Sequence, residues 1–451
     1  MGMMTTREAA LWCDGEMRGA ETPILRVTTD SRQIQPGDLF VALRGEHFDG
    51  LQFAPAALAA GAAAVMVSSE AKAQLEPAVV VADTRIALGR LASGWRMRMP
   101  ATVVAITGSS GKTTVKEMLA ALLRAQTGDD AVLATVGNLN NDIGLPLTLL
   151  GVRQQHAFAV LEAGMNHAGE LAWLSEIAQP DLVLVNNAGS AHIGLLGSAE
   201  AVARAKGELV EASPARAIVV LNADDRFYPL WCGMAGTRRI VSFGMNAQAT
   251  VAGSWVATGA GGKLQVRLDQ DTFELPLPLA GRHNAMNALA AIAAAYALGV
   301  ESTAMRAGLA RVHLPKGRLQ LGHAAHGSRL IDDSYNANPE SVRAAIDVLC
   351  GFSGTRILVL GDMGELGAYS DEAHHAIGQY AREAGIEAVY ALGTASRATV
   401  AAFGDRGEHF SDAHALAQAV QARLDAQTTV LVKGSRFMGM ERVVNLLEEN
   451  D

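Results

Sequence analysis

From Thr102 onward, short apolar runs rich in β-branched residues alternate with segments that have the period of a helix. The runs are TVVAIT, AFAVLEAG, DLVLVNNAG, AIVVLNADD, RILVLGDMG and TVLVKGS. Strands and helices that alternate in this way form βαβ units, in which helices cover both faces of a parallel sheet. The pattern therefore predicts an α/β fold built on mostly parallel sheets.

The segment after the first run has its apolar residues on one side of a predicted helix. Val115, Met118, Leu119, Leu122 and Leu123 follow the i, i+3, i+4, i+7, i+8 spacing. This spacing puts the side chains on one helical face. We expect that face to pack on the sheet as part of the core.

Two breaks in the pattern divide the chain. One lies near Met99–Pro100, after the strand-like segments LFVAL and AVMV, and the other lies near His313–Pro315, after the helical stretch NAMNALAAIAAAYALG. A chain of 451 residues is long enough for several domains of about 100–200 residues each. We therefore predict three domains, at residues 1–100, 101–314 and 315–451.

The composition indicates a compact enzyme rather than a disordered or fibrous chain, with 49% hydrophobic and 18% charged residues. The formal net charge of -9 repels nucleic acid and anionic membranes, and no run of Lys or Arg overrides it. We expect no nucleic-acid partner. An anionic ligand needs a local site made of backbone N–H groups, a few cations or a metal.

Signals of location point to the cytoplasm. Cys13, Cys232 and Cys350 have neither CxxC spacing nor an even count, which suits a reducing compartment. The N-terminal segment contains acidic residues and no long apolar core, unlike a secretory signal. The longest apolar stretch, from Ala56 to Val67, is shorter than the roughly 20 residues of a membrane span. We expect a cytoplasmic protein with no membrane span.

Polar residues follow several of the predicted strands. They are Thr107–Gly108, Glu162, Asn186–Asn187, Asn222–Asp224, Gly361–Asp362 and Lys433–Gly434. In open α/β sheets the ligand crevice lies beyond the carboxyl ends of the strands, so these positions are candidates for a site. The alternative for each of them is a polar residue that only terminates a strand.

A glycine-rich loop lies between the run TVVAIT and the amphipathic helix. Its residues are Gly108, Ser109, Ser110, Gly111, Lys112, Thr113 and Thr114. Glycines let the backbone approach phosphates, and the N–H groups and dipole of the helix favour negative charge. Lys112 would reach the terminal phosphates of ATP, and the Thr113 hydroxyl would bind magnesium. Ile106 stands where the usual motif has its first glycine, and the alternative is a glycine-rich turn with a chance lysine.

Three further residues are candidates of unequal strength. Glu162 and His192 follow adjacent predicted strands, and a carboxylate and an imidazole suit a divalent cation. The alternative for His192 is a hydrogen-bonded loop residue. Lys206, in ARAKGELVEA, is by periodicity a solvated helix residue.

Eight segments together resemble the Mur ligase family, in order across nearly the whole chain. They are TGSSGKTT, LEAGMNHAGE, NNAGSAHIG, AKGELVEA, GRHNAMNALAA, GRLQ, IDDSYNANPES and VKGSRFMGME. The resemblance implies a small N-terminal α/β domain that binds a UDP precursor. It also implies a central parallel-sheet domain like that of P-loop ATPases and a C-terminal Rossmann-like α/β domain.

Parts of the chain resemble one branch of this family. YNANP, GNLNNDIGLPLTLL and KGSRFMGMERVV are similar to the members that join D-alanyl-D-alanine to UDP-N-acetylmuramoyl-tripeptide in peptidoglycan precursor synthesis. DSRQIQPGDLFVALRGEHFDG is shared with the members that add the third amino acid, diaminopimelate or lysine, which are the nearest alternative. More distant alternatives are folylpolyglutamate synthase, a nucleotide-switched regulator or motor ATPase, and an inactive scaffold.

The resemblance also implies roles for single residues. Lys112, Glu162, His192 and Lys206 would be catalytic, with ATP and Mg²⁺ as cofactors. Lys206 would be carbamylated and would hold a second magnesium ion with His192 and Glu162, while Thr113 would bind the first. A desolvated lysine loses its proton readily, which is what attack on carbon dioxide requires.

Other positions would hold the nucleotide. Asn284 and Asn287 would contact adenine, Arg318 the phosphates and Asp333 the ribose, by resemblance to the family. Asn284 has the alternative of capping the alanine-rich helix, and Asp333 has the alternative of a turn residue.

The resemblance also implies residues that bind the substrates. Ser31 and Arg32 would contact the UDP portion; the sugar and peptide would lie near Asn138, Asn140 and Asn141. The incoming amine or the peptide would lie near Lys433, Ser435 and Arg436. For the positions rich in Asn and Ser the alternative is an ordinary turn. The expected partners are these small-molecule substrates, and the chain is expected to act as a monomer.

Overall fold

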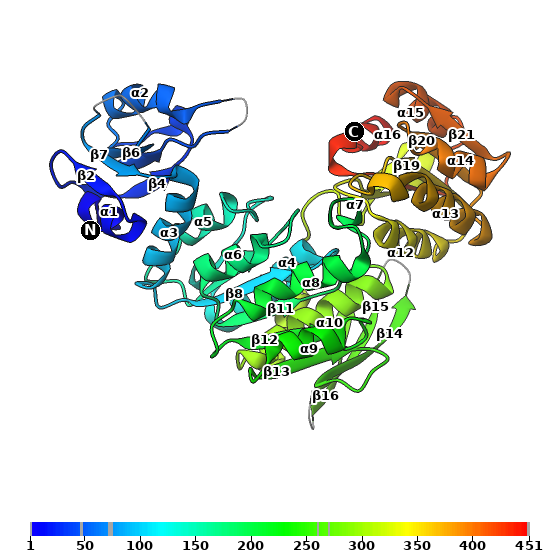
Figure 1. The fold of residues 1–451 in the computed structure, drawn as a ribbon. Helices are drawn as coiled ribbons and strands as arrows, with labels where there is room; N and C mark the ends of the chain where they lie inside the picture. The colour runs from blue at the N-terminus through cyan, green and yellow to red at the C-terminus, as the bar shows by residue number, and fades with distance from the viewer. Residues whose placement is uncertain (1, 46–47, 71–74, 259–260, 269–270, 449–451) are drawn as a thin grey trace.

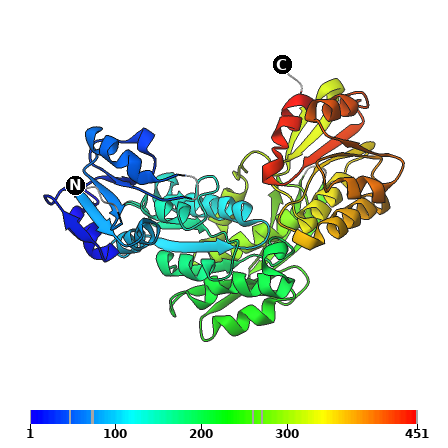
Figure 2. The ribbon, with the colours of Figure 1, turned by 45° about the horizontal axis from the view of Figure 1, so that its top comes forward.

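The chain folds into three α/β units that lie in a row, with the N-terminal and C-terminal units on opposite sides of the central one (Figures 1 and 2). The computed structural model describes all residues except 1, 46–47, 71–74, 259–260, 269–270 and 449–451. The predicted α/β class with three domains is confirmed. We propose domain boundaries near residues 100 and 314, because both positions fall in links between regular elements.

The N-terminal unit contains a five-stranded sheet in the order β2-β7-β6-β5-β4. The predicted segments LFVAL and AVMV form most of its buried strands β5 and β6. Its strands are β2 (Glu16–Arg18), β4 (Arg26–Thr28), β5 (Asp38–Val41), β6 (Ala64–Ser68) and β7 (Ala78–Val81), with a separate pair of β1 (Met4–Thr5) and β3 (Pro23–Ile24). Its helices are α1 (Thr6–Cys13), α2 (Ala54–Ala59) and α3 (Thr84–Arg96), with 3₁₀ turns η1 (Ser31–Gln33) and η2 (Gly50–Phe53).

The central unit contains a nine-stranded sheet in the order β16-β15-β14-β13-β12-β11-β8-β10-β9. Its strands are β8 (Thr102–Thr107), β9 (Val132–Ala134), β10 (Phe158–Glu162), β11 (Leu182–Val185), β12 (Ile218–Asn222), β13 (Ile240–Gly244), β14 (Val251–Thr258), β15 (Gly261–Leu268) and β16 (Asp271–Leu277). Strands β8 to β14 pair in parallel, whereas β14, β15 and β16 form an antiparallel extension that the sequence analysis did not predict.

Helices pack on both faces of the central sheet. They are α4 (Lys112–Thr127), α5 (Gly144–Leu149), α6 (Glu170–Ala178), α7 (Ile193–Leu196), α8 (Ala199–Glu211), α9 (Tyr228–Ala235), α10 (Arg282–Ala297) and α11 (Ser302–Leu309), with a 3₁₀ turn η3 (Asp129–Ala131). The predicted apolar face of α4 is confirmed, since its five residues are fully buried. Helix α10 packs beside α4 in the same core, and its small alanines permit a close approach.

The C-terminal unit contains a six-stranded sheet in the order β17-β18-β22-β19-β20-β21, parallel except for the β17–β18 pair. Its strands are β17 (Gln320–Ala324), β18 (Ser328–Asp333), β19 (Thr355–Gly361), β20 (Ala388–Leu392), β21 (Gly407–Phe410) and β22 (Thr428–Lys433). Its helices are α12 (Pro339–Cys350), α13 (Ser370–Glu383), α14 (Arg397–Phe403), α15 (Ala413–Gln421) and α16 (Glu441–Leu447), with 3₁₀ turns η4 (Ala325–Gly327), η5 (Gly367–Tyr369) and η6 (Arg436–Met438). No helix in the described part of the chain is long and apolar enough to cross a membrane.

Candidate active site

The carboxyl ends of three adjacent strands bring the glycine-rich loop together with Glu162. Strand β8 lies between β10 and β11, and Glu162 at the end of β10 is in register with Ile106. Helix α4 begins at Lys112, directly after Gly111. The φ angle of Gly111 is +80°, and a Cβ atom there would lie 2.3 Å from Oδ1 of Asn287. Only glycine fits this turn without strain.

Thr113, Glu162, Asn140 and Arg318 form one hydrogen-bonded group. The Thr113 hydroxyl donates to Oε2 of Glu162 at 2.8 Å, and Nδ2 of Asn140 donates to Oε1 of the same carboxylate at 2.8 Å. A guanidinium nitrogen of Arg318, from the C-terminal unit, donates to the Thr113 hydroxyl at 2.9 Å. Asn140 was assigned to substrate, and here it holds a carboxylate of the phosphate-loop group.

Lys112 lies near the charged residues Glu162, Arg318 and Glu365. Its Nζ donates to the carbonyl oxygen of Gly108 at 2.8 Å. Burial lowers the pKa of Lys112, the carboxylates of Glu162 and Glu365 act in the opposite direction, and Arg318 lowers it further. The lysine, both carboxylates and the arginine therefore share one electrostatic environment.

Lys206 is fully buried, so the expectation that it is solvated is wrong. Its Nζ has no hydrogen-bond partner among the described residues. Burial lowers the pKa of Lys206 well below the usual lysine range; the charge of Lys112 lowers it further, and Glu365 opposes the shift. The signal was in the sequence, because Val202, Ala205, Lys206 and Leu209 share one buried face of α8. An unpaired amine at such a position is costly, which makes it a candidate for function.

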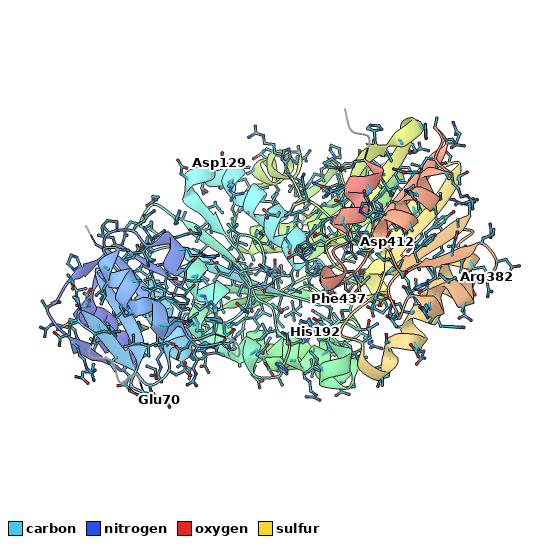
Figure 3. The ribbon with its side chains drawn as sticks, turned by 90° about the horizontal axis from the view of Figure 1, so that it is seen from above. Glu70, Asp129, His192, Arg382, Asp412 and Phe437 are labelled. Atoms are coloured by element: carbon cyan, nitrogen blue, oxygen red, sulfur yellow. The ribbon has the colours of Figure 1, made fainter. Side chains whose placement is uncertain are left out.

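His192 lies where the central unit meets the C-terminal unit, on the side of the molecule where Phe437 is found (Figure 3). It directly precedes α7, and its φ angle is +65°. Its Nδ1 lies 2.7 Å from Oε2 of Glu365, in the loop after β19. The contact with His192 is the largest cause that lowers the pKa of Glu365. Glu365 was not predicted, although it comes shortly after the strand end Gly361–Asp362 that was noted.

Two predicted adenine-contacting residues lie beside the glycine-rich loop. Nδ2 of Asn186 donates to Oδ1 of Asn287 at 2.9 Å, and Nδ2 of Asn287 donates to Oδ1 of Asn284 at 3.3 Å. The capping alternative for Asn284 is wrong, because the residue before α10 is Gly281 and the Asn284 amide donates to the Ala280 carbonyl at 2.8 Å. Asn186 is a further member of this group that the sequence reading left without a role.

Asp333 pairs with Lys433 across neighbouring strand ends. Nζ of Lys433 lies 2.5 Å from Oδ2 of Asp333, and the backbone N–H of Leu319 donates to Oδ1 at 3.2 Å. Burial raises the pKa of Asp333, and the charges of Lys433 and Arg318 oppose that shift. This largely buried carboxylate bonds across strands, so it is more than a local turn residue. Ser435 lies two residues after Lys433, and its hydroxyl accepts a hydrogen bond from the backbone N–H of Gly364 at 2.8 Å.

Five predicted substrate-binding residues lie outside the hydrogen-bonded groups described above. Arg32 pairs with Asp30 at 2.8 Å in the N-terminal unit, next to Ser31, and Arg436 pairs with Glu441 at 2.9 Å. Asn138 is exposed, and Oδ1 of Asn141 accepts from the N–H of Gly144 at 2.9 Å, as in an ordinary turn. Their assignment to substrate stays a prediction. The residues concerned are Ser31, Arg32, Asn138, Asn141 and Arg436.

Tyr335 is a residue that the sequence analysis did not single out, although it lies in the quoted motif IDDSYNANPES. Two guanidinium groups lie near its ring, that of Arg318 at 4.4 Å and that of Arg436 at 5.6 Å from the ring centroid. Cations are attracted to the face of an aromatic ring. Tyr335 therefore links Arg318, which contacts Thr113, to Arg436, a residue predicted to bind substrate.

Comparison with known proteins covers the chain in three parts. The Mur ligase middle domain matches residues 106–295, the Mur ligase glutamate ligase domain matches residues 317–436, and the Mur ligase family catalytic domain matches residues 23–96. The UDP-N-acetylmuramoyl-tripeptide--D-alanyl-D-alanine ligase of Escherichia coli (strain K12) is 44% identical over 97% of this chain and 96% of its own length. The chain belongs to the Mur ligase family. It is an ATP-dependent ligase that joins a carboxylate to an amine.

Solved structures of Mur ligases have the same architecture. A crystal structure of MurF from Acinetobacter baumannii superposes with a TM-score of 0.90, at 35% identity and with 98% of each chain covered. A structure of MurF ligase from Thermotoga maritima in complex with ADP has a TM-score of 0.84 at 29% identity, covering 93% of this chain and 96% of that one. The likeness extends over all three units of this Mur ligase.

Proposed function

We propose that this chain joins D-alanyl-D-alanine to the peptide carboxylate of UDP-N-acetylmuramoyl-tripeptide and uses ATP to do so. The observation that carries this proposal is the 44% identity, over nearly the full length of both chains, to the E. coli enzyme of that name. The contacts among Lys112, Thr113, Glu162 and Arg318 support it, because they gather the charges that a nucleotide triphosphate requires.

A carboxylate must be activated before an amine can attack it. The γ-phosphoryl group of ATP passes to the peptide carboxylate, which gives an acyl phosphate and ADP. The amine of D-alanyl-D-alanine then attacks the acyl carbon, and the tetrahedral intermediate collapses to an amide and inorganic phosphate. Lys112 and Arg318 offset the negative charge that builds up between the phosphate and the carboxylate.

The residues present suit magnesium. No group of three His, Cys, Asp or Glu side chains in the described residues forms a ready metal site. The buried Glu162 carboxylate and the Thr113 hydroxyl offer hard oxygen ligands, which magnesium prefers. We assign Thr113 to one ion, and Glu162, His192 and Lys206 to a second. Bound magnesium would supply charge neutralisation at the phosphates.

Before Lys206 can bind the second magnesium ion, its amine must be converted to an anionic group. Nζ of Lys206 is buried and unpaired, and its lowered pKa favours the neutral amine. That amine attacks CO₂, forms an N–C bond and releases one proton to water. The product is a carbamate, whose oxygens are ligands of the kind that magnesium binds. We propose this modification at Lys206.

Contacts between the central and C-terminal units support a closed reaction site. Nδ2 of Asn338, before α12, donates to the Ser110 hydroxyl at 2.9 Å, and the Ser190 hydroxyl donates to Glu340 at 2.7 Å. Both join the C-terminal unit to loops of the central site. Closure excludes water, which would otherwise hydrolyse an acyl phosphate.

The acceptor assay tests the proposed function. Purified protein is incubated with ATP, either the UDP-linked dipeptide or the UDP-linked tripeptide, and one candidate amine, and phosphate release and product mass are measured. We expect a product only from the tripeptide with D-alanyl-D-alanine. Addition of diaminopimelate or lysine to the dipeptide would assign the chain to the neighbouring branch, and phosphate release without any amine would indicate a plain ATPase.

Tyr335→Leu is expected to weaken the use of ATP. Loss of the ring removes two cation–π contacts of about 0.5–2 kcal/mol each, so KM for ATP should rise roughly ten-fold. Tyr335→Phe keeps the ring and is the matched control, with KM near that of the wild type. Steady-state kinetics at saturating precursor measure both variants. Equal KM values for the Leu and Phe variants would contradict the role of the ring.

The location and assembly of the enzyme follow from the same proposal. All three cysteines are free in the described structure, which suits a reducing cytoplasm. The site is built from the units of one chain, so we propose that a monomer is active. Light scattering on the eluted, active protein should give a mass near 47.2 kDa.

A further inference from the structure

Lys116 is a buried lysine that the proposed reaction does not use. It lies on α4 one turn after Lys112, and its side chain is 2% exposed. Its Nζ donates to the carbonyl oxygen of Thr135 at 2.5 Å and pairs with Oε1 of Glu117 at 2.7 Å. A buried charge is costly unless it has partners, and here one partner is the backbone of a different segment. The lysine therefore fixes the position of Thr135 relative to α4.

Thr135 is the first residue of the loop between β9 and α5, and it contacts Glu162 directly. Its hydroxyl accepts a hydrogen bond from the backbone N–H of Glu162 at 3.0 Å, and its own N–H donates to the carbonyl oxygen of Val160 at 3.0 Å. The residue is 1% exposed. The start of the loop is therefore held against β10, the strand that has Glu162 at its carboxyl end.

The same loop returns to Glu162 at Asn140. Nδ2 of Asn140 donates to Oε1 of the Glu162 carboxylate at 2.8 Å, and the carbonyl oxygen of Asn140 accepts from the N–H of Gly164 at 2.8 Å. The residues between these two points, 136–139, are exposed. The loop is therefore attached on both sides of its tip to the segment around Glu162, while the tip itself is open to a ligand.

The far end of the loop joins the N-terminal unit. Nη2 of Arg85, on α3, lies 2.7 Å from Oδ1 of Asp142. The loop also contains Asn138 and Asn141, which the sequence predicts to lie near the sugar and peptide of the precursor. It therefore extends from the helix of the phosphate loop to the unit that is expected to bind the UDP portion.

We propose that Lys116 is a positioning residue for the UDP-linked tripeptide: it anchors the loop of residues 135–143 to α4, so that Asn140 stays on Glu162 and the exposed tip is held in place for the precursor. This inference rests on the proposed function, which gives the loop its substrate. Lys116 contacts neither ATP nor the precursor. It acts through the carbonyl group of Thr135, and a charged donor makes this hydrogen bond stronger than a neutral donor would.

Lys116→Met keeps the length of the side chain and removes its donor. We expect KM for the UDP-linked tripeptide to rise about ten-fold, the usual effect of losing a hydrogen bond from a charged group. KM for ATP should stay within about three-fold of the wild type, because Lys112 is held by Gly108 and not by Lys116. Lys263→Met, which removes an exposed lysine from β15, is the matched control and should equal the wild type. An unchanged KM for the precursor, or an equal rise in both KM values, would overturn the proposal.

A double-mutant cycle with Asn140→Ala tests whether Lys116 acts through the loop. Asn140→Ala removes the contact with Glu162 and should itself raise KM for the precursor. If the lysine works by holding Asn140 in place, Lys116→Met added to Asn140→Ala should raise KM by no more than about a further three-fold. Effects that multiply, as they do for two independent sites, would contradict the coupling.

Hydrogen exchange gives a readout that needs neither ATP nor precursor. The backbone N–H groups of Glu162 and Gly164 bond to Thr135 and Asn140, so their exchange rates report opening of the loop. In Lys116→Met we expect both to exchange at least about ten-fold faster, while the amides of β12 keep their wild-type rates. Equal acceleration of all these amides would show a general loss of stability, and unchanged rates would show that no anchor was lost. Either result would overturn the proposal.

Thr135→Val probes the same attachment more mildly and keeps the proposal testable if Lys116→Met does not fold. Valine has nearly the same shape as threonine. It retains the carbonyl group that Lys116 binds and removes the hydroxyl that accepts from Glu162. KM for the precursor should rise and the N–H of Glu162 should exchange faster; wild-type values of both would contradict the proposal. Failure of the wild type to ligate D-alanyl-D-alanine would instead refute the proposed function, and the exchange rates distinguish the two failures.

Discussion

Replacement of Lys112 by methionine is expected to reduce kcat for ligation by about 10²–10³-fold, the usual cost of losing one group that stabilises transition-state charge. Lys112 follows Gly111 at the start of α4, and its environment includes the carboxylates of Glu162 and Glu365. Methionine has a similar length and no charge. It therefore removes the cation from the point where two anions, the phosphate and the peptide carboxylate, must approach each other.

The control for this variant is Lys263→Met. Lys263 lies on β15 of the same unit, pairs with Glu274 at 3.1 Å and is 60% exposed. Rates are measured by phosphate release and product mass at saturating ATP and precursor. The control should keep the wild-type rate. A Lys112→Met enzyme that kept more than about a tenth of kcat would remove Lys112 from its proposed role.

Replacement of Lys206 by methionine is expected to have opposite effects on activity and stability. Activity should fall by at least about 100-fold, because no carbamate can form and the assigned metal ligand is lost. The free energy of unfolding should rise by roughly 1–3 kcal/mol, because a buried amine without a partner is replaced by an apolar chain of similar shape. Stability and function conflict at this position.

The difference in stability between Lys206→Met and the wild type is expected to depend on pH. The pKa of Lys206 is lowered by folding, so the unfolded chain binds the extra proton and the stability of the wild type rises with pH. The stability gained by Lys206→Met is therefore larger at neutral pH than at alkaline pH. It shrinks as the pH approaches the ordinary lysine value of about 10.4.

Denaturant unfolding in CO₂-free buffer measures this difference, and ¹³C NMR of the wild type with ¹³C-bicarbonate should show a carbamate signal that the variant lacks. Lys263→Met is again the control. A destabilised but fully active Lys206→Met protein would contradict both the buried, unpaired state and the carbamate.

The sequence predicted the parts of this molecule that local patterns determine. Runs such as TVVAIT and DLVLVNNAG became parallel strands, and the spacing from Val115 to Leu123 marked the buried face of α4. The antiparallel strands β14 to β16 were missed, although the alternating burial of β15 shows the period of two that could have revealed them. Lys206 was misplaced because the apolar spacing around it was not applied to the lysine itself.

Contacts between domains could not be predicted in the same way. His192 and Glu365, or Ser110 and Asn338, are distant in the chain and meet only because two units pack together. No periodicity links such residues. The contacts of the Tyr335 ring with Arg318 and Arg436 depend on the same long-range packing, together with the turn at Gly317.

Oxygen transfer tests the central claim most directly. A UDP-linked tripeptide with ¹⁸O in its terminal carboxylate is incubated with ATP, D-alanyl-D-alanine and the enzyme, and the released phosphate is analysed by mass spectrometry. If the carboxylate takes the γ-phosphoryl group, one ¹⁸O atom must leave with the phosphate when the amide forms. Product accompanied by unlabelled phosphate would show that the carboxylate is never phosphorylated, and would contradict the account.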